Sequence, residues 1–143
     1  MKIVPDANIY VSALVSKFGN PRRIFDLWLA KRFDILISEP ILNEIDRVLR
    51  YPRITKRHLL DDAAITLFTE LLAEQAVWVE PVEMLNVIID DESDNRYVEC
   101  AVAGRADFIV SGDEDLLKIG SFRGIFVLSQ ASFLALLNAS AQS

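Results

Sequence analysis

The sequence predicts an α/β fold in which helices cover both faces of a central parallel sheet. Short apolar segments that suit buried strands alternate along the whole chain with longer segments of helical periodicity. Residues that favour helix starts and stops stand at the boundaries between these segments. Because strands separated by helices are typical of parallel sheets, this alternation indicates the fold class.

In the first half of the chain, two expected strands alternate with helical segments. Pro21 suits the first turn of a helix that follows the break at Gly19 and Asn20. Ser38 is expected to cap the next helix, which Pro52 ends. The expected elements are strands at residues 2–4 and 33–37, a helix or turn at 9–15, and helices at 21–30, 38–50 and 55–75.

The second half continues the alternation. Gly104 is expected to stop one helix, and Ser129 is expected to cap the last. The expected elements are strands at residues 76–79, 107–110 and 124–128, an extended segment at 84–89, an acidic loop at 90–93, and helices at 94–104, 115–119 and 129–137.

Length and composition indicate one domain over residues 1–143, with 52% hydrophobic residues to build its core. No apolar run approaches the roughly 20 residues that span a bilayer, and the start lacks the pattern of a signal peptide. The one cysteine, Cys100, lies in an apolar helical pattern and is expected to be a buried thiol. These features predict a cytoplasmic protein without a membrane anchor.

Charge is divided unevenly along the chain, although the net charge is −6. Residues 1–60 carry 11 basic and 6 acidic side chains, whereas residues 61–143 carry 4 and 15. This division suits a protein that contacts phosphates with one region and cations with another. Simple solvated helix faces explain the basic residues equally well; these are Arg22, Arg23, Arg47, Arg50, Arg53, Lys56 and Arg57.

Carboxylates stand where expected strands end or helices begin. Asp6 follows the first strand, Asp94 opens a helix, and Asp113 and Asp115 follow the strand at residues 107–110. If the strands before Asp6 and Asp113 are neighbours, these two side chains emerge together at one sheet edge. Glu44 lies at the border of the apolar stripe of its helix, so it is expected to point toward the same edge.

Converging carboxylates repel one another unless a cation neutralises them, and Mg²⁺ and Mn²⁺ prefer such oxygen ligands. The chemistry that uses this arrangement is metal-assisted hydrolysis of a phosphodiester. His58, the single histidine, is far in sequence from every acid, which argues against a Ser-His-Asp or two-histidine mechanism. Taken one at a time, each acid also suits a helix end, a turn or a solvated face.

Four segments resemble the motifs of the PIN-domain family of ribonucleases. They are residues 3–13 (IVPDANIYVSA), 38–44 (SEPILNE), 94–101 (DNRYVECA) and 106–117 (ADFIVSGDEDLL). The resemblance extends from residue 2 to about residue 137 and is strongest to the PIN-family toxins of toxin–antitoxin systems, which are similar to VapC. It implies a three-layer α/β/α PIN-like fold, cleavage of RNA with Mg²⁺ or Mn²⁺, homodimerisation, and an antitoxin protein that covers the site.

The resemblance also implies residue roles. Asp6, Glu44, Asp94 and Asp113 take the positions of metal ligands, and Asp115 that of an auxiliary acid. Asn8 and Ser111 would orient ligands or bound water by hydrogen bonds. Pro5, at the end of the first strand, differs from the common motif, and we expect a local irregularity there.

Other interpretations remain open at this point. Asp90 or Asp91 could replace Asp94 as third ligand, although Asp94 is in register with the apolar stripe of its helix. A phosphatase or phosphoacceptor domain also places an aspartate after its first strand, but Asn8 stands where a phosphatase has a second acid. A catalytically silent PIN-fold binding module is a third alternative. Leu59, Leu60 and Leu67 are candidates for a dimer surface or for core positions.

Overall fold

The computed structural model describes residues 1–88 and 92–141. Ile89, Asp90 and Asp91, which the sequence analysis places in an extended segment and an acidic loop, lie outside the described residues. The elements are β1 (Lys2–Pro5), α1 (Ala7–Val15), α2 (Asn20–Leu29), β2 (Asp34–Ile37), α3 (Glu39–Leu49), α4 (Pro52–His58), α5 (Asp62–Gln75), β3 (Val77–Trp78), the 3₁₀ helix η1 (Glu92–Asp94), α6 (Asn95–Gly104), β4 (Phe108–Val110), α7 (Glu114–Leu117), β5 (Ser121–Phe122), β6 (Ile125–Leu128) and α8 (Gln130–Ala141).

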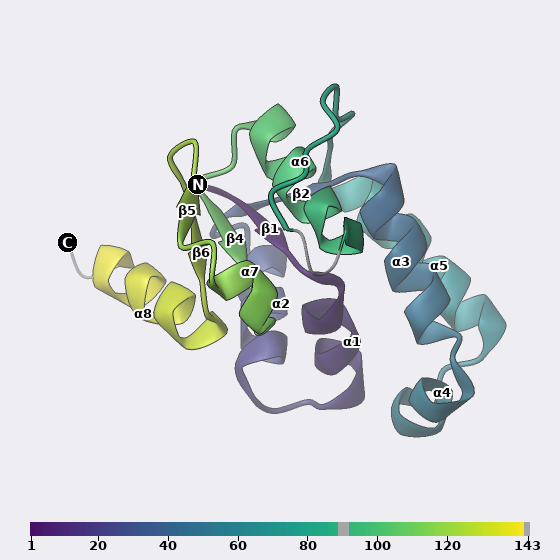
Figure 1. Cartoon of the computed structure of the whole chain (residues 1–143). Coiled ribbons are helices and arrows are strands. Elements are labelled where there is room, and N and C mark those ends of the chain that lie inside the picture. The colour runs from purple at the N-terminus through teal and green to yellow at the C-terminus, as the bar shows by residue number, and fades with distance from the viewer. Residues whose placement is uncertain (89–91, 142–143) are drawn as a thin grey trace.

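Within the described residues, six strands form one mostly parallel sheet with the order β3-β2-β1-β4-β6-β5. Helix α6 lies on one side of the strands, and α2 and α8 lie on the other (Figure 1). Both Ile3 and Val4 in β1 are fully buried, as expected for a strand covered on both faces. The predicted three-layer α/β/α fold is therefore confirmed. The sheet is mixed rather than purely parallel, because β5 pairs antiparallel with β6.

Strands β1 and β4 are neighbours, and their register places Pro5 beside Val110. The N–H of Asp6 donates to the carbonyl of Val110 at 3.0 Å, so pairing continues past the proline. Pro5 is thus accommodated at the last position of the strand, where the chain turns into α1. This register brings the residues that follow β1 and β4 to the same edge of the sheet.

The predicted helix over residues 55–75 is wrong, because the chain forms two helices there. Leu59 ends α4 in the left-handed conformation at φ 60°, and Asp61 caps α5 by accepting from the N–H of Ala64 at 2.8 Å. Pro52, expected only to end the preceding helix, also begins α4. The break turns α4 away from α5 at one end of the molecule (Figure 1).

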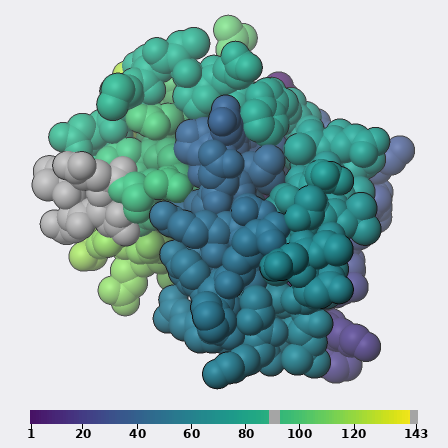
Figure 2. Space-filling view, turned by 90° about the vertical axis from the view of Figure 1, so that its right-hand side faces the viewer, coloured from purple at the N-terminus to yellow at the C-terminus, as the bar shows by residue number. Residues whose placement is uncertain are grey.

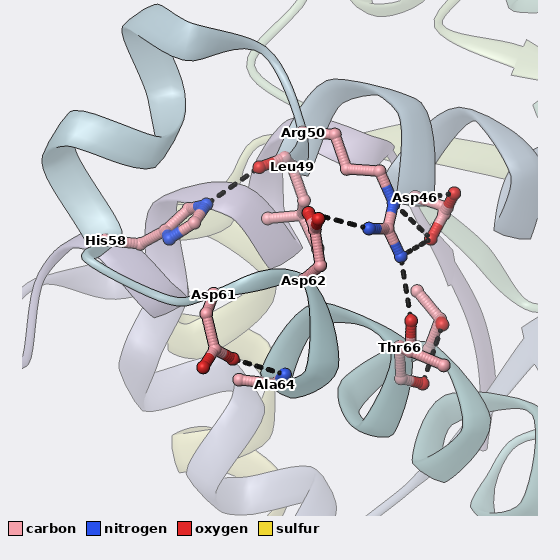
Figure 3. Close-up of polar contacts among 9 residues, drawn as sticks. Asp46, Leu49, Arg50, His58, Asp61, Asp62, Ala64 and Thr66 are labelled. Carbon is pink, nitrogen blue, oxygen red and sulfur yellow. Dashed lines mark hydrogen bonds and ion pairs between the residues drawn. The ribbon is translucent and has the colours of Figure 1, made fainter.

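Buried His58 and half-buried Arg50 hold this junction together (Figure 3). His58 Nε2 contacts the Leu49 carbonyl at 2.8 Å, and Nδ1 accepts from the N–H of Leu60 at 2.9 Å. Nδ1 is therefore unprotonated, and Nε2 donates. The Arg50 guanidinium donates to Asp46, Asp62 and Thr66. Arg50 thus has a structural role within the protein, and neither a phosphate contact nor a solvated helix face describes it.

One helix end differs from the prediction: helix α1 begins two residues earlier than expected, because Asp6 caps it. Helix α6 ends at Gly104, as predicted, but the left-handed position after it is taken by Arg105 at φ 55°. Gly104 also permits a close approach, since a Cβ there would lie 2.5 Å from Leu36 Cδ1 and 2.9 Å from Val79 Cγ2.

The capping predictions for two serines had different outcomes. Ser38 occupies the position before α3, but its side chain makes no capping bond and is fully buried. Ser129 caps α8 as predicted, with its hydroxyl accepting from the N–H of Ser132 at 3.1 Å. Cys100 is fully buried, as expected for a core thiol. None of the described helices has both the length and the apolar character needed to cross a membrane.

Candidate metal centre

The carboxyl edge of the sheet gathers the acidic residues singled out from the sequence. Asp6 directly follows β1, and Ser111 directly follows β4. Since the two strands are paired in register up to Pro5 and Val110, Asp6 and Ser111 lie side by side. The Ser111 hydroxyl donates a hydrogen bond to Asp6 Oδ2. The prediction that Asp6 and Asp113 emerge at one edge depended on this pairing, which is confirmed.

Three carboxylates form a compact group that we call the acidic triad: Asp94, Asp113 and Asp115. One oxygen of each lies within 4.8 Å of the others. Asp94 is buried just before α6, whereas Asp113, just before α7, and Asp115, within α7, are half-buried. Asp113 caps α7, with its Oδ1 accepting from the N–H of Asp115 at 2.8 Å. Nearby like charges disfavour one another, so this arrangement favours a bound cation.

A hydrogen-bonded path connects Asp6 to the acidic triad. While the Ser111 hydroxyl donates to Asp6, its oxygen accepts from the N–H of Asp113 at 2.9 Å. Ser111 is fully buried, so this double contact fixes the spacing between the loops after β1 and β4. The expected supporting position of Ser111 therefore has a clear geometric basis. Asp6 itself is not a member of the group of three.

Burial raises the pKa of Asp6 above its ordinary value. The hydrogen bond from Ser111 and those from the backbone N–H groups of Ile9 and Asn8 act in the opposite direction, and the negative charge of Asp113 adds to the rise. The side chain of Asn8 is exposed, so its contribution to the Asp6 carboxylate comes from the backbone. The surroundings of Asp6 make its negative charge costly without a nearby cation.

Glu44 also lies outside the acidic triad. Its Oε2 accepts from the Tyr97 hydroxyl at 3.1 Å and pairs with Arg96 Nη1 at 2.9 Å. Its Oε1 is 3.6 Å from Arg47 Nη2. The side chain is 18% exposed, which matches its predicted place at the border of the apolar stripe of α3. Protein cations therefore already neutralise Glu44 in this structure.

Tyr97 connects several elements of this region, although the sequence analysis gave it no role within the segment at residues 94–101. Its buried hydroxyl accepts from the N–H of Ala7 at 3.1 Å while it donates to Glu44. Burial raises the pKa of Tyr97 well above its usual range, so the hydroxyl keeps its proton for this bond. Tyr97 thus joins α6, α3 and the start of α1. The sequence signal for this role was its spacing: Tyr97 comes three residues after Asp94 and therefore lies on the same face of the helix.

Arg96 is the second residue that sequence reasoning missed. Besides Glu44, its guanidinium contacts the carbonyls of Ser93, at 2.6 Å, and Pro40, at 3.3 Å. Arg96 therefore ties the start of α6 to the start of α3. A positive charge in the first turn of a helix interacts unfavourably with the helix dipole. This unfavourable position was the sequence signal that Arg96 has a role outside its own helix.

Comparison with known protein families shows to which family this chain belongs. A family model described as PIN domain matches residues 2–115, which include every acid discussed above. The chain belongs to the PIN-domain family. The uncharacterized protein MJ1680 of Methanocaldococcus jannaschii is 30% identical over 119 residues, covering 83% of this chain and 75% of that protein.

The donor set of this PIN domain suits a divalent cation. All three members of the acidic triad offer hard carboxylate oxygens, which Mg²⁺ and Mn²⁺ prefer, and no histidine or thiol lies in the group. The triad's oxygens are close enough to share an ion, and Asp6 is one hydrogen-bonded residue away through Ser111. The residues that are present therefore fit the metal that PIN nucleases generally use.

Proposed function

We propose that this PIN domain is a metal-dependent endoribonuclease that hydrolyses RNA phosphodiester bonds with Mg²⁺ or Mn²⁺. The observation that carries the proposal is the acidic triad, whose oxygens lie within 4.8 Å of one another beside buried Asp6. Asp6, Glu44, Asp94 and Asp113 would be the metal ligands, and Asp115 an auxiliary ligand. This set combines the triad with Asp6, which Ser111 links to it, and with Glu44, which the motif resemblance supplies.

The chain's own residues hold these ligands in place. Ser111 orients Asp6 through its hydroxyl, and the backbone N–H of Asp115 orients Asp113. The bound metal would supply an activated water and neutralise charge on the leaving oxygen. Glu44 has one oxygen, Oε1, whose arginine partner is 3.6 Å away, and this oxygen is the one we assign to the metal. Tyr97 would keep Oε2 oriented during turnover.

The RNA would bind through exposed basic residues. Arg53, Lys56 and Arg57 on α4 are exposed, unlike Arg50, whose donors are engaged within the protein. Figure 2 shows the face of the molecule around α3 (blue). Helix α5 (teal) lies on one side of it, and residues from the second half of the chain (green) lie on the other. Phosphate contacts of this kind position a nucleic acid without reading its sequence.

The toxin role in a toxin–antitoxin pair is the finer part of the proposal. It rests on the motif resemblance, together with apolar surface that a protein partner could cover. Leu59 and Leu67, for which core positions were an alternative, are 82% and 68% exposed, while Leu60 is half-buried. Leu59 follows α4 and Leu67 lies on α5, so both are accessible to a second copy of the chain or to an antitoxin.

Cleavage of a mixed RNA pool tests the enzymatic proposal. Purified protein is incubated with Mn²⁺, Mg²⁺ or EDTA beside the Asp6→Asn variant and a matched control, Glu114→Gln, which removes an exposed charge next to the triad. We expect metal-dependent cutting by the wild type and the control only. Full activity of Asp6→Asn would refute the site. A folded protein that neither binds metal nor cuts would favour the catalytically silent binding module.

A further inference from the structure

A cavity of about 300 Å³ lies at the amino end of the sheet. It is formed by the last turn of α6, the segment that leads into β4, and the turn between β5 and β6. The lining residues are Val102, Arg105, Ala106, Arg123, Gly124 and Ile125. Strands β4 and β6 are parallel, so the cavity lies where both begin, whereas the acids lie where β1 and β4 end. The cavity is therefore separate from the candidate metal centre.

Both charged residues of the lining have a backbone conformation that suits glycine or asparagine better than arginine. Arg105 follows α6 with φ 55°, at the position where helices usually have glycine. Arg123 is the first residue of the two-residue turn between β5 and β6, with φ 50°, and such turns favour asparagine followed by glycine. An unfavourable conformation of this kind is typical of functional positions. Two of them at one cavity indicate that these side chains have a use beyond folding.

The guanidinium groups of both arginines have donors free for a ligand. The Arg105 side chain is exposed and makes no hydrogen bond or ion pair within the described part of the chain. Arg123 uses only Nη1, which pairs with Glu83 at 3.1 Å, and both side chains of this pair are about half exposed. Exposed pairs contribute little to stability. The two arginines can therefore take up an anion with little loss of other contacts.

Negative groups near the cavity do not oppose an anion in it. No acidic side chain of the described residues lines it. Asp107, the next residue along the chain, accepts from the N–H of Lys2 at 2.8 Å, on the side of β1. The carbonyl groups at the end of α6 accept from the N–H groups of Arg105 at 3.3 Å and Ala106 at 2.9 Å. The lining thus combines two positive charges with apolar surface.

We propose that this cavity binds a small organic phosphate. Its phosphate group lies between the guanidinium groups of Arg105 and Arg123, and its apolar part contacts Val102 and Ile125. A phosphate monoester carries a charge of about −1.5 to −2 at pH 7, which two guanidinium groups match better than they match a carboxylate. The volume is at the lower end of the range for small-molecule pockets, so the ligand is small. The site is independent of the proposed ribonuclease function.

Calorimetric titration of the full chain tests the proposal. The buffer contains EDTA, because without a divalent cation the acidic triad repels phosphates. The ligands are phenyl phosphate, AMP, inorganic phosphate and benzoate. The variants Arg105→Gly and Arg123→Asn supply residue types that these backbone conformations favour, so both should fold. Arg32→Gln is the matched control: this exposed arginine precedes β2 at the same end of the sheet and does not line the cavity.

We expect wild-type protein to bind phenyl phosphate or AMP at least tenfold more tightly than benzoate or inorganic phosphate. A preference for AMP would indicate a nucleotide ligand, and a preference for phenyl phosphate an aryl phosphate. Each cavity variant should weaken this binding at least tenfold, the order expected for losing a charge-assisted hydrogen bond. Arg32→Gln should bind like the wild type. The Tm values of both cavity variants should equal or exceed that of the wild type, because the unfavourable backbone conformations are relieved.

Several results would overturn the proposal. If neither organic phosphate binds, or if both cavity variants bind it as tightly as the wild type, the site is refuted. Equal affinity for benzoate would contradict the preference for phosphate, and equal affinity for inorganic phosphate would contradict the apolar contact. A cavity variant that melts well below the wild type would show that its arginine serves folding, which removes the basis of the inference.

Discussion

Removing the Tyr97 hydroxyl should destabilise the protein more than its size suggests. In Tyr97→Phe the buried N–H of Ala7 loses its acceptor, and Glu44 loses one of its donors. Leaving a buried donor unsatisfied costs about 1–3 kcal/mol. We therefore expect the free energy of unfolding to fall by about 2 kcal/mol.

This loss converts to a change in melting temperature. An unfolding entropy of about 2.1 cal/mol/K per residue gives roughly 300 cal/mol/K for 143 residues, so 2 kcal/mol lowers Tm by about 7 °C. Circular dichroism in EDTA at neutral pH measures the shift without a contribution from metal. The same change at Tyr10 is the matched control, because its fully buried hydroxyl has no hydrogen-bond partner among the described residues.

Tyr10→Phe should leave Tm unchanged or raise it slightly, because the substitution removes a buried polar group that makes no hydrogen bond to any described residue. A Tyr97→Phe variant that melts within a degree of the wild type would contradict the connecting role of Tyr97. Equal losses in both variants would show that the aromatic positions tolerate no change of any kind, and that the hydrogen bonds of Tyr97 are not the cause.

Three further changes test other parts of the structure. The raised pKa of Asp6 means that, above the ordinary aspartate pKa, the folded state binds more protons than the unfolded chain. The free energy of unfolding therefore falls as pH rises through the folded pKa. Asp6→Asn should thus stabilise the metal-free protein at pH 7 but not at pH 3, as urea titrations in EDTA would show. Gly104→Ala should cost about 1 kcal/mol in urea unfolding despite its better helix propensity, because the new Cβ would meet buried Leu36 at 2.5 Å. His58→Ala should cost about 2–3 kcal/mol in the same assay, since two backbone groups lose their partner; no loss would contradict its role at the junction in Figure 3.

The centre of the sheet was predictable because β1, β2 and β4 are buried on both faces. Apolar runs such as residues 33–37 signal this burial directly in the sequence. Strand β5 was not predictable, since it has two residues and a turn in which both Arg123 and Gly124 have positive φ. Turns of this kind are usually signalled by asparagine or glycine at both central positions. Arginine at the first position gave no such signal.

Helix boundaries depended on contacts that a local pattern does not contain. Helix α6 ends at Gly104 as predicted, but the sequence did not show that this glycine permits the close approach of Leu36, which lies far away in the sequence. The break between α4 and α5 left only the weak signal of an aspartate at position 61, inside a segment of continuous helical character. Tertiary packing decided both cases.

The candidate site was predictable to the extent that its acids follow strands. Asp113 and Asp115 could be placed at the sheet edge from their position after β4, and Asp94 from the start of α6. The ion pair of Glu44 with Arg96 and its hydrogen bond with Tyr97 could not be predicted, because both depend on how α3 packs against α6. Sequence position gives the edge of the sheet, whereas packing decides which acids share one point.

The central claim, that the acidic triad holds a divalent cation, is tested most directly by calorimetric titration with Mn²⁺. Wild-type protein and Glu114→Gln are compared with Asp113→Asn at constant pH and salt. We predict saturable binding by the first two and a loss of affinity of at least tenfold in Asp113→Asn, because one charged ligand is removed from a group of three. Equal Mn²⁺ affinity in all three proteins would contradict the claim.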